Sequence, residues 1–420
     1  MEYLNQLGTA ALKAGHELAV NVVNGHEINK DAPFSPEVPL DLKNSMPDLL
    51  DRFCLVLPGD HSKPVDPEKH SVWILDNTAF RLPDDESARK ALNVQDPSAP
   101  WHVEFVAAFF IKDSGKNASE IVAKIADKID LSPDDIETRK LIASRLQPFL
   151  DTVLPNHTVQ MSIHKSLEKT LGPSNHQGIS SQVLSLPLTP NPTTAECQSA
   201  ASPSSSTIFV EPTGWAVISD IDDTIKITQT PSAIGTLKTT FAEPVPQPVA
   251  GMPDFYAYLN TALKDPAFFY LSASPYNLYT FLKDFRDKNY PPGTIILRDA
   301  SWQNLGGLIS SLTLGTQDYK ADRMVKIHSW LPQRKIVCIG DSTQKDPEAY
   351  AETAKKFPGW VKKIFIRKVT GIAELNEEDK NSDERFEKAF EGLDRGLWHV
   401  FEEPGELKAL VDGLVKKDVA

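Results

Sequence analysis

The sequence has few cysteines, no excess of basic residues and no long apolar segment. Its three cysteines, Cys54, Cys197 and Cys338, are too few and too widely spaced for a disulfide framework or a zinc site, which favours a reducing compartment. Acidic residues outnumber basic ones by 57 to 44, and a net charge of −13 argues against wrapping of nucleic acid. The longest apolar run has seven residues, whereas a membrane-spanning helix needs about 20. The N-terminus also lacks the basic and apolar regions of a secretory signal, so we expect a cytoplasmic protein.

The length of 420 residues predicts two or three domains, and one segment marks the boundary. Ser, Thr and Pro fill 14 of the 23 positions in residues 185–207. Because this composition offers little apolar surface to bury, we predict a flexible linker. The linker separates an N-terminal helix and tail (1–50) and an accessory domain (51–184) from a second domain (208–420).

The region before the linker is typical of a mixed α+β domain that is rich in sheet. A helix is predicted within about residues 1–23, and we expect it to pack on the protein because its polar face is not rich in Lys and Arg, as a membrane-surface helix would be. Aromatic and β-branched runs predict strands, and polar amphipathic stretches predict helices. The strands are expected at 53–57, 70–75, 101–111 and 157–163, and the helices at 117–130 and 132–150.

After the linker, strands alternate with helices, which predicts a parallel, doubly wound sheet. The tail from about residue 381 to 420 is expected to be helical, because Phe386, Phe390, Leu393 and Leu397 share one face. The strands are predicted at 214–221, 268–274, 293–299, 335–341 and 361–369, and the helices at 252–263, 276–288, 322–331 and 347–357.

Acidic residues follow the first of these strands directly. Asp220, Asp222, Asp223 and Thr224 come after the apolar run at 215–219. Strands of a parallel sheet carry their ligands at the carboxyl edge, and acids held there need a compensating cation or substrate. An Asp-x-Asp triplet is a weak signal in an acidic protein, and we expect Asp223 to be a turn or helix-start acid.

Three further signals occur later in the chain. Ser272 is the first hydroxyl after a strand, and Lys320 stands just before a predicted helix. Asp341 ends another strand, with Asp346 five residues later. A hydroxyl and a lysine can bind phosphate oxygens, and carboxylates are the ligands that Mg²⁺ prefers. Each of these residues alone could be an ordinary turn or surface residue, but their order fits the predicted elements.

This order resembles the haloacid dehalogenase (HAD) superfamily of phosphotransferases, whose motifs are Asp-x-Asp-x-Thr, Ser or Thr, Lys, and an acidic pair. The segments SDIDDTIK (219–226), LSASPYNLY (271–279) and GDSTQKDPEAY (340–350) are similar to a fungal family of Mg²⁺-dependent phosphatidate phosphatases that is named for cortical actin patches. The similarity spans about 208–370, with a fainter echo at 72–80 and 101–110. The sequence lacks an obvious Pro-rich C-terminal segment, which puts actin-patch partners in doubt.

The resemblance implies a HAD-like Rossmannoid fold, with helices on both faces of the sheet, and a two-step reaction. Asp220 would be the nucleophile that forms an aspartyl-phosphate, and Asp222 the general acid and base. Mg²⁺ would lie between the carboxylates of Asp220 and Asp341 and the backbone carbonyl of Asp222.

The resemblance also implies roles for the remaining motif residues. Lys320 would offset the repulsion between an anionic nucleophile and an anionic substrate, and Ser272 would hold a phosphate oxygen. Thr224 would steady the first loop, and Asp346 would orient Asp341 or a metal-bound water.

The insertions at 225–251 and 299–319 are short, which favours an open site and a substrate presented on something large. The leading hypothesis is hydrolysis of phosphatidate at a membrane surface by a peripheral protein, with actin-patch or membrane-trafficking proteins as partners. Two alternatives stay open. The first is a phosphatase for a phosphoprotein or small phosphate ester, and the second is a non-catalytic lipid- or protein-binding scaffold.

Overall fold

A computed structural model describes residues 62–83, 89, 92, 94, 96–114, 118–188, 194–298 and 316–419. All of these belong to one compact unit, His61–Ala420. The predicted N-terminal helix, the tail to residue 50 and the strand at 53–57 lie outside the described residues, as does most of the insertion at 299–319.

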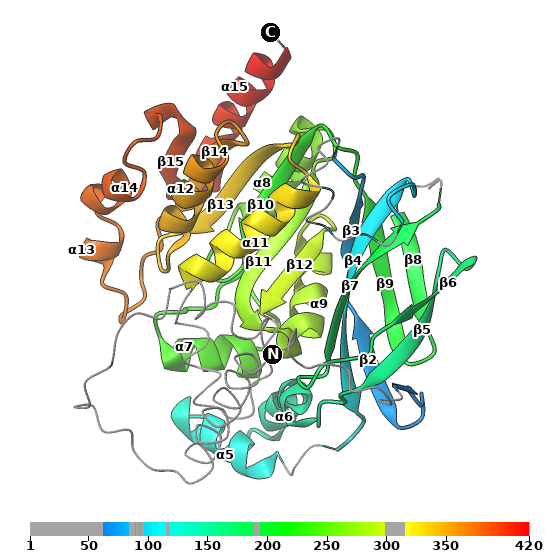
Figure 1. The fold of residues 1–420 in the computed structure, drawn as a ribbon. Helices are drawn as coiled ribbons and strands as arrows, with labels where there is room; N and C mark the ends of the chain where they lie inside the picture. Colours follow the sequence, from blue (N-terminus) through cyan, green and yellow to red (C-terminus); the bar gives the residue numbers. More distant parts are fainter. Residues whose placement is uncertain are drawn as a thin grey trace, which may run out of the picture. The chain divides into compact units, whose positions relative to one another are not determined.

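The first part of this unit is a nine-stranded mixed sheet, coloured blue to green in Figure 1. Its strands follow the order β1-β5-β8-β9-β3-β4-β2, while β6 pairs with β5 and β7 pairs with β4. The strands predicted at 70–75, 101–111 and 157–163 are present, as are both predicted helices. The elements are β1 (Lys63–Pro64), β2 (His70–Ile74), β3 (Asn77–Phe80), β4 (Trp101–Ile111), α5 (Ser119–Lys128), α6 (Ile136–Leu150), β5 (His157–Ile163), β6 (Leu167–Leu171), β7 (Ile179–Leu186), β8 (Thr194–Ser199) and β9 (Ser202–Phe209).

The prediction of a flexible linker at 185–207 is wrong for much of its length. Strands β8 and β9 occupy residues 194–199 and 202–209 and pair with each other, and β9 also pairs with β3. Small side chains fill the buried positions of this ribbon, since Ala195, Cys197, Ser205 and Thr207 are all at most 4% exposed. Buried and exposed positions alternate along β8. The composition of the segment did not reveal this alternation, because Ser and Thr can occupy buried strand positions when the neighbouring strands leave little room.

Strand β4 is apolar without alternation because both of its faces are buried. Val103, Phe105 and Phe109 belong to the core within the first sheet. Ala108 and Phe110 belong to a second core that also contains residues of the sheet described next. The longest apolar run of the sequence therefore lies in a strand whose two faces pack into two different cores.

The second sheet has six strands in the order β12-β11-β10-β13-β14-β15, and every neighbouring pair is parallel. All five strands predicted for this region are present. The strands are β10 (Trp215–Asp220), β11 (Ala267–Pro275), β12 (Thr294–Arg298), β13 (Lys335–Asp341), β14 (Val361–Arg367) and β15 (Trp398–Phe401).

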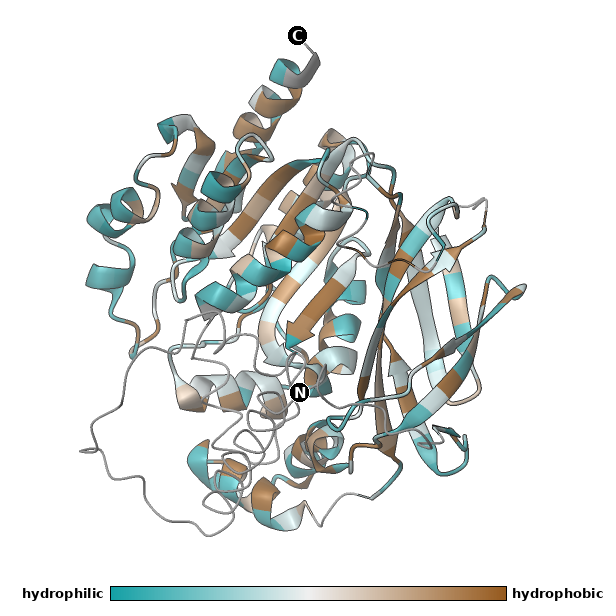
Figure 2. Cartoon of the chain, in the orientation of Figure 1, coloured by the Kyte–Doolittle hydropathy of each residue, from teal (hydrophilic) through white to brown (hydrophobic). Residues whose placement is uncertain are grey.

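Helices cover both faces of this parallel sheet, as predicted. Residues of α8, α9 and α15 share one core with the sheet, and residues of α11, α12 and α14 share the other. Figure 2 shows the consequence, with hydrophobic strands between helices whose outer surfaces are hydrophilic. The helical elements are α7 (Ala233–Leu237), the π-helix η1 (Lys238–Ala242), α8 (Met252–Ala262), η2 (Tyr276–Leu278), α9 (Tyr279–Asn289), α11 (Thr316–Trp330), α12 (Asp346–Lys356), α13 (Glu377–Lys380), α14 (Asp383–Ala389), η3 (Arg395–Leu397), η4 (Pro404–Glu406) and α15 (Leu407–Val419).

The tail is only partly helical, which corrects the prediction for 381–420. Residues 398–401 form β15, which adds to β14 in parallel. Phe386 and Phe390 are buried as expected, but Phe390 stacks on Trp398 of the strand. The four-residue strand was missed because it is too short to produce a visible period of its own.

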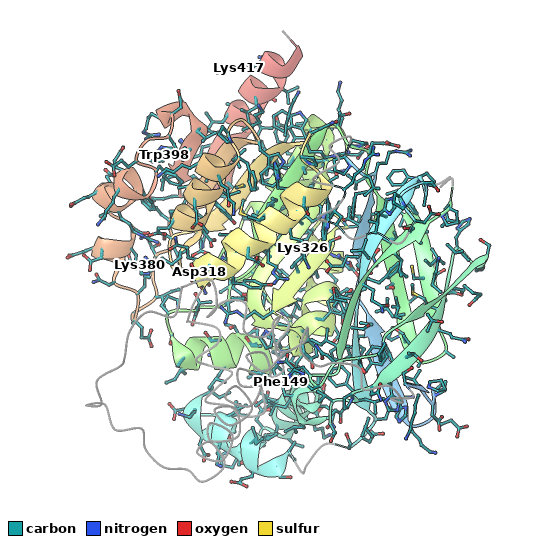
Figure 3. The ribbon with its side chains drawn as sticks, in the orientation of Figure 1. Phe149, Asp318, Lys326, Lys380, Trp398 and Lys417 are labelled. Carbon is teal, nitrogen blue, oxygen red and sulfur yellow. The ribbon has the colours of Figure 1, made fainter. Side chains whose placement is uncertain are left out.

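Ion pairs connect the two sheets. Lys326 of α11 lies 2.7 Å from Glu104 of β4, and Figure 3 labels Lys326 where α11 approaches the first sheet. Arg286 of α9 lies 2.7 Å from Asp76, which follows β2. No helix in the described part of the chain is both long and apolar enough to cross a membrane.

Candidate active site

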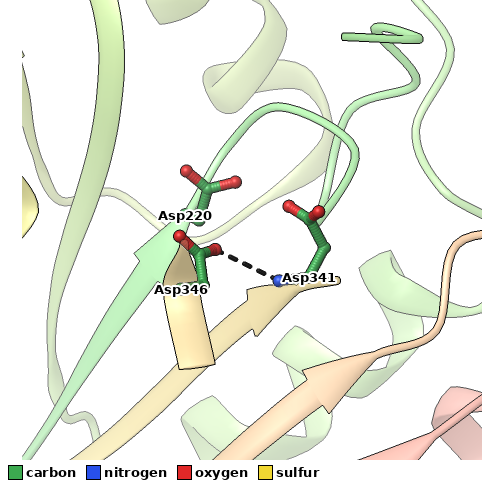
Figure 4. Close-up of side chains that lie close together, drawn as sticks. All are labelled: Asp220, Asp341 and Asp346. Carbon is green, nitrogen blue, oxygen red and sulfur yellow. Dashed lines mark hydrogen bonds between the residues drawn. The ribbon is translucent and has the colours of Figure 1, made fainter. Parts of the chain in front are cut away.

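The predicted acidic residues meet at the carboxyl edge of the parallel sheet. Strand β10 ends at Asp220, and its neighbour β13 ends at Asp341. The strand order runs outward from β10 on one side and from β13 on the other, so these two strands flank the point where the order reverses. Such a switch point is where open α/β sheets bind ligands. Figure 4 shows Asp220, Asp341 and Asp346 together at this edge.

Lys320 is paired with two of the three carboxylates. Its ammonium lies 2.6 Å from Asp220 Oδ1 and also contacts Asp346 Oδ1. Lys320 is fully buried, and Asp220 is 2% exposed. The sequence placed Lys320 before a helix, whereas it lies inside α11, which begins at residue 316. The helix thereby holds the ammonium over the end of β10.

Asp346 is the first residue of α12, and both of its carboxylate oxygens have partners. The second oxygen accepts a hydrogen bond from the backbone N–H of Asp341 at 3.1 Å, drawn as the dashed line in Figure 4. Gly340 makes room for this contact, because a Cβ at residue 340 would lie 2.4 Å from Asp346 Oδ2. Asp346 therefore links the ammonium of Lys320 to the backbone that carries Asp341.

Thr224 connects the two acid loops. Its hydroxyl lies 3.0 Å from Asp220 Oδ2 and 3.0 Å from Asp341 Oδ2. A hydroxyl has one proton and can donate to only one of these carboxylate oxygens at a time. The other oxygen of Asp341 accepts from the backbone N–H and the hydroxyl of Thr343. A cation bound by these two carboxylates would reduce the electrostatic repulsion between Asp220 and Asp341.

Asp222 points to a different set of hydroxyls. Its Oδ2 accepts from Ser272 at 2.7 Å, and its Oδ1 accepts from Thr228 at 2.8 Å. Ser272 lies in β11, as predicted, but its hydroxyl is directed at Asp222. Asp222 is 9% exposed, the most exposed of the acids in this cluster.

Asp223 organises the loop, in keeping with the expectation that it is a turn acid. Its carboxylate accepts from the backbone N–H groups of Thr228, Gln229 and Thr230 and from the hydroxyl of Thr230. Its φ of 61° lies in the left-handed region, which is costly for a residue with a side chain. These hydrogen bonds offset that cost and fold residues 228–230 back toward the site.

The electrostatics of the cluster follow from crowding of buried acids. Burial and the neighbouring charges of Asp346, Asp341 and Asp222 raise the pKa of Asp220 well above its usual range, although Lys320 opposes the shift. Burial, followed by the charge of Asp346, also raises the pKa of Asp341. Burial alone would lower the pKa of Lys320, but the surrounding carboxylates outweigh it and the pKa is raised. Lys320 is therefore held as a cation.

The donor set fits a hard divalent cation. One carboxylate oxygen from each of Asp220, Asp341 and Asp346 lies within 4.8 Å of the others. Oxygen-only ligands of this kind suit Mg²⁺. The buried acids of the site also outnumber its buried lysines, Lys320 and Lys226, so an added positive charge would lower the energy of the ionised cluster.

The sequence did not identify three residues that contact this site. Thr343 lies two residues after Asp341, and the Asp-Ser-Thr spacing is a turn signal that could have found it. Thr228 contacts Asp222, and the buried ammonium of Lys226 lies 2.9 Å from Thr228. Burial lowers the pKa of Lys226, while Asp222 and Asp223 oppose the shift. No sequence signal marks either residue, because their contacts depend on the loop folding back.

The site lies in a segment that is similar to a family of known proteins. The family described as "Phosphatidate phosphatase APP1, catalytic domain" matches residues 215–368. Phosphatidate phosphatase APP1 of Saccharomyces cerevisiae is 30% identical over 291 residues, which cover 64% of this chain and 48% of that protein. An uncharacterized protein of Schizosaccharomyces pombe is 32% identical over 162 residues, which cover 37% of this chain and 25% of that protein.

The aligned regions amount to about half the length of the yeast phosphatase and a quarter of the other relative. The matched residues 215–368 run from β10 to the end of β14 and contain Asp220, Ser272, Lys320 and Asp341. The family resemblance inferred from the motifs is therefore confirmed for residues 215–368, which match the family model of that catalytic domain.

Proposed function

We propose that this chain is a Mg²⁺-dependent phosphatidate phosphatase that converts phosphatidate to diacylglycerol and phosphate. The supporting observation is the buried cluster of Asp220, Asp341 and Asp346 around Lys320, at the sheet edge within residues 215–368. The parallel sheet with helices on both faces and the four motifs in order support a HAD-like fold for this region. A cluster in which buried carboxylates outnumber the cations that pair with them is typical of a functional site.

Asp220 is the proposed nucleophile. A carboxylate oxygen of Asp220 forms a bond to phosphorus, and the bond from phosphorus to the glycerol oxygen breaks with its electron pair. Asp222 gives a proton to that oxygen, so diacylglycerol leaves as a neutral alcohol. Asp222 then takes a proton from water, whose oxygen attacks the aspartyl-phosphate, and phosphate leaves as Asp220 is regenerated.

The contacts of Asp222 support this division of work. Ser272 and Thr228 hold its two carboxylate oxygens in place, and its side chain is the most exposed of the cluster acids. Asp220 instead is held by an ion pair with Lys320 and a hydrogen bond from Thr224, which orient its carboxylate. The two carboxylates thus have separate environments, as separate nucleophile and acid-base roles require.

The carboxylates of Asp220 and Asp341, with the backbone carbonyl of Asp222, would hold Mg²⁺. When bound, the ion supplies positive charge that offsets repulsion between the anionic site and an anionic phosphate. Lys320 supplies a second, permanent positive charge next to Asp220. Asp346 positions Lys320 and the Asp341 backbone, and Thr224 holds the two acid loops together.

Ser272 is proposed to bind a phosphate oxygen once substrate is present. Its hydroxyl points to Asp222 in this structure, so it must rotate toward the phosphate when Asp222 is protonated. Phosphatidate as substrate rests on the likeness to the yeast phosphatase. Association with cortical actin patches or membrane-trafficking proteins stays a prediction.

The test is phosphate release from phosphatidate in mixed micelles, with and without Mg²⁺, by wild type and Asp220→Asn. A soluble phosphate ester is assayed in parallel. We expect Mg²⁺-dependent release from the lipid that is lost in Asp220→Asn. Activity on the soluble ester alone would keep the chemistry and discard the lipid substrate. A folded protein with no activity on either substrate would favour the scaffold.

A further inference from the structure

The exposed aliphatic side chains are concentrated beside the active site. Among the described residues, only four large hydrophobic side chains are exposed: Ile136, Ile227, Ile234 and Val245, at 60%, 39%, 53% and 63%. Three of them lie within residues 225–251, the insertion between β10 and α8. Exposed apolar residues that gather on one segment, rather than scatter singly, indicate an interaction surface.

This segment forms one wall of the site. Thr228 contacts Asp222, and the hydroxyl of Thr230 lies 3.2 Å from that of Thr343 in the second acid loop. The backbone N–H of Ile227 donates to the carbonyl of Gln247, which brings Ile227 next to the stretch that carries Val245. An apolar surface on this segment is therefore continuous with the wall that holds Asp222.

The segment is also firmly supported from beneath. Leu237 and Phe241 of α7 and η1 are buried against α5 and α6 in a separate core. Figure 3 labels Phe149 of α6, whose ring lies 5.9 Å from that of Phe241. The guanidinium of Arg145, also in α6, donates to the carbonyls of Thr240, Glu243 and Pro244. The outward side chains therefore stand on a packed base rather than on an isolated loop.

The segment has little surface charge in a chain of net charge −13. Residues 225–251 contain two lysines and one glutamate, but Lys226 is buried, so only Lys238 and Glu243 lie at the surface. Lys238 is exposed, whereas Glu243 is only half-buried and no carboxylate of the segment is fully exposed. The other exposed side chains are neutral, namely Gln229, Ala233, Pro244, Gln247 and Ala250. The exposed carboxylate of Glu374 accepts a hydrogen bond from Ser232, so the apolar side chains have one lysine and one outside acid beside them. Exposed apolar side chains on a surface of low net charge suit a bilayer interface.

We propose that residues 227–247 are a membrane-docking surface that seats the active site on a phosphatidate-containing bilayer. Ile227, Ile234 and Val245 enter the interfacial region of the bilayer, and Lys238 contacts anionic headgroups. The headgroup phosphate then reaches Asp220 and Asp222 on the side of the site where Thr228 lies. This proposal rests on the proposed function, and it explains how a chain of net negative charge can act on a negatively charged lipid surface.

The test uses the full chain with Ile234→Asp and Val245→Asp combined. Binding to phosphatidylcholine vesicles that contain phosphatidate is measured by co-sedimentation, and phosphate release is measured on the same vesicles. A short-chain phosphatidate below its micelle concentration serves as a monomeric substrate. The matched control carries Thr194→Asp and Gln198→Asp, which add the same charge at exposed positions of β8.

We expect the docking variant to lose at least about tenfold in vesicle binding and in release from vesicles, because two apolar contacts become charges. Its rate on the monomeric substrate should stay within about twofold of wild type, since neither residue contacts the acids. The control should match wild type throughout. Equal losses in both variants, or vesicle binding unchanged in the docking variant, would overturn the docking surface while leaving the proposed function intact. Failure of wild type on both forms of phosphatidate would instead reject the proposed function, and the docking surface with it.

Discussion

Two sets of buried acids in this protein have opposite electrostatics. At the sheet edge, Asp220 and Asp346 share the ammonium of Lys320, and burial with repulsion between neighbouring carboxylates raises the pKa of Asp220 and of Asp341. At the contact between the sheets, Asp76 is matched by the ammonium of Lys283 and the guanidinium of Arg286. Burial alone would raise the pKa of Asp76, but these two cations outweigh it and the pKa is lowered.

Glu104 shows the same pattern as Asp76. Burial opposes ionisation, yet Lys326 and a hydrogen bond from Ser181 lower its pKa. The acids between the sheets are therefore neutralised within the protein and serve its structure. The acids at the sheet edge are under-neutralised, and this excess of negative charge is what a cation and a phosphoryl substrate can use. The comparison predicts that mutations of the acids between the sheets affect stability and that mutations of the acids at the sheet edge affect activity.

Asp220→Asn should have the largest effect. We expect phosphate release to fall at least about a thousandfold, because the amide cannot act as the nucleophile. The free energy of unfolding should not fall, since the change removes one charge from a crowded cluster. Urea denaturation of the same preparation checks the second point. A marked loss of stability would show that Asp220 is needed for folding as well.

Gly340→Ala should disturb the same cluster without changing any charge. The added methyl would lie against the Asp346 carboxylate, displacing it from Lys320 and from the backbone of Asp341. We expect activity to fall about a hundredfold, as a displacement of catalytic groups by about 1 Å commonly does. Gly413→Ala in α15 is the control, because no atom lies within 4 Å of its added Cβ. Full activity in Gly340→Ala would contradict the positioning role of Asp346.

Asp76→Asn should act on stability instead. The amide keeps the shape but leaves Arg286, which is 3% exposed, with a weaker partner. We expect the free energy of unfolding to fall by about 3 kcal/mol, the usual effect of breaking a buried ion pair. The exposed pair of Asp66 with Lys69 provides a control, since Asp66→Asn should leave stability nearly unchanged. Activity per folded molecule should be the same in both variants.

The pH dependence of stability should be the smallest and most specific effect. Because the pKa values of Asp76 and Glu104 are lowered in the folded state, their contribution is complete above the unfolded value of about 4. It is lost as the pH falls through the lowered folded values. Asp76→Asn combined with Glu104→Gln should therefore show a shallower loss of stability on acidification than wild type. Parallel curves for the two proteins in acid would refute this assignment.

Much of the parallel sheet was predictable, because each strand is a short apolar run that ends at a polar residue. Asp220 and Asp341 stand at strand ends, and parallel pairing brings such ends to one edge whatever the details of packing. The linker prediction failed for the opposite reason. Ala195, Cys197 and Thr207 are buried only because neighbouring strands cover them, and composition carries no record of neighbours.

The order of the motifs along the chain determined the chemistry available to this protein, since the residue types and their places after strands are local properties. Tertiary structure alone decided which partner each group meets. The direction of Ser272 toward Asp222, the ion pair of Lys320 with Asp220 and the hydrogen bond between Thr224 and Asp341 all depend on segments distant in sequence. So does the exposure of Ile234 and Val245, because α5 and α6 pack against Leu237 and Phe241 of the same segment while these two side chains stay in solvent.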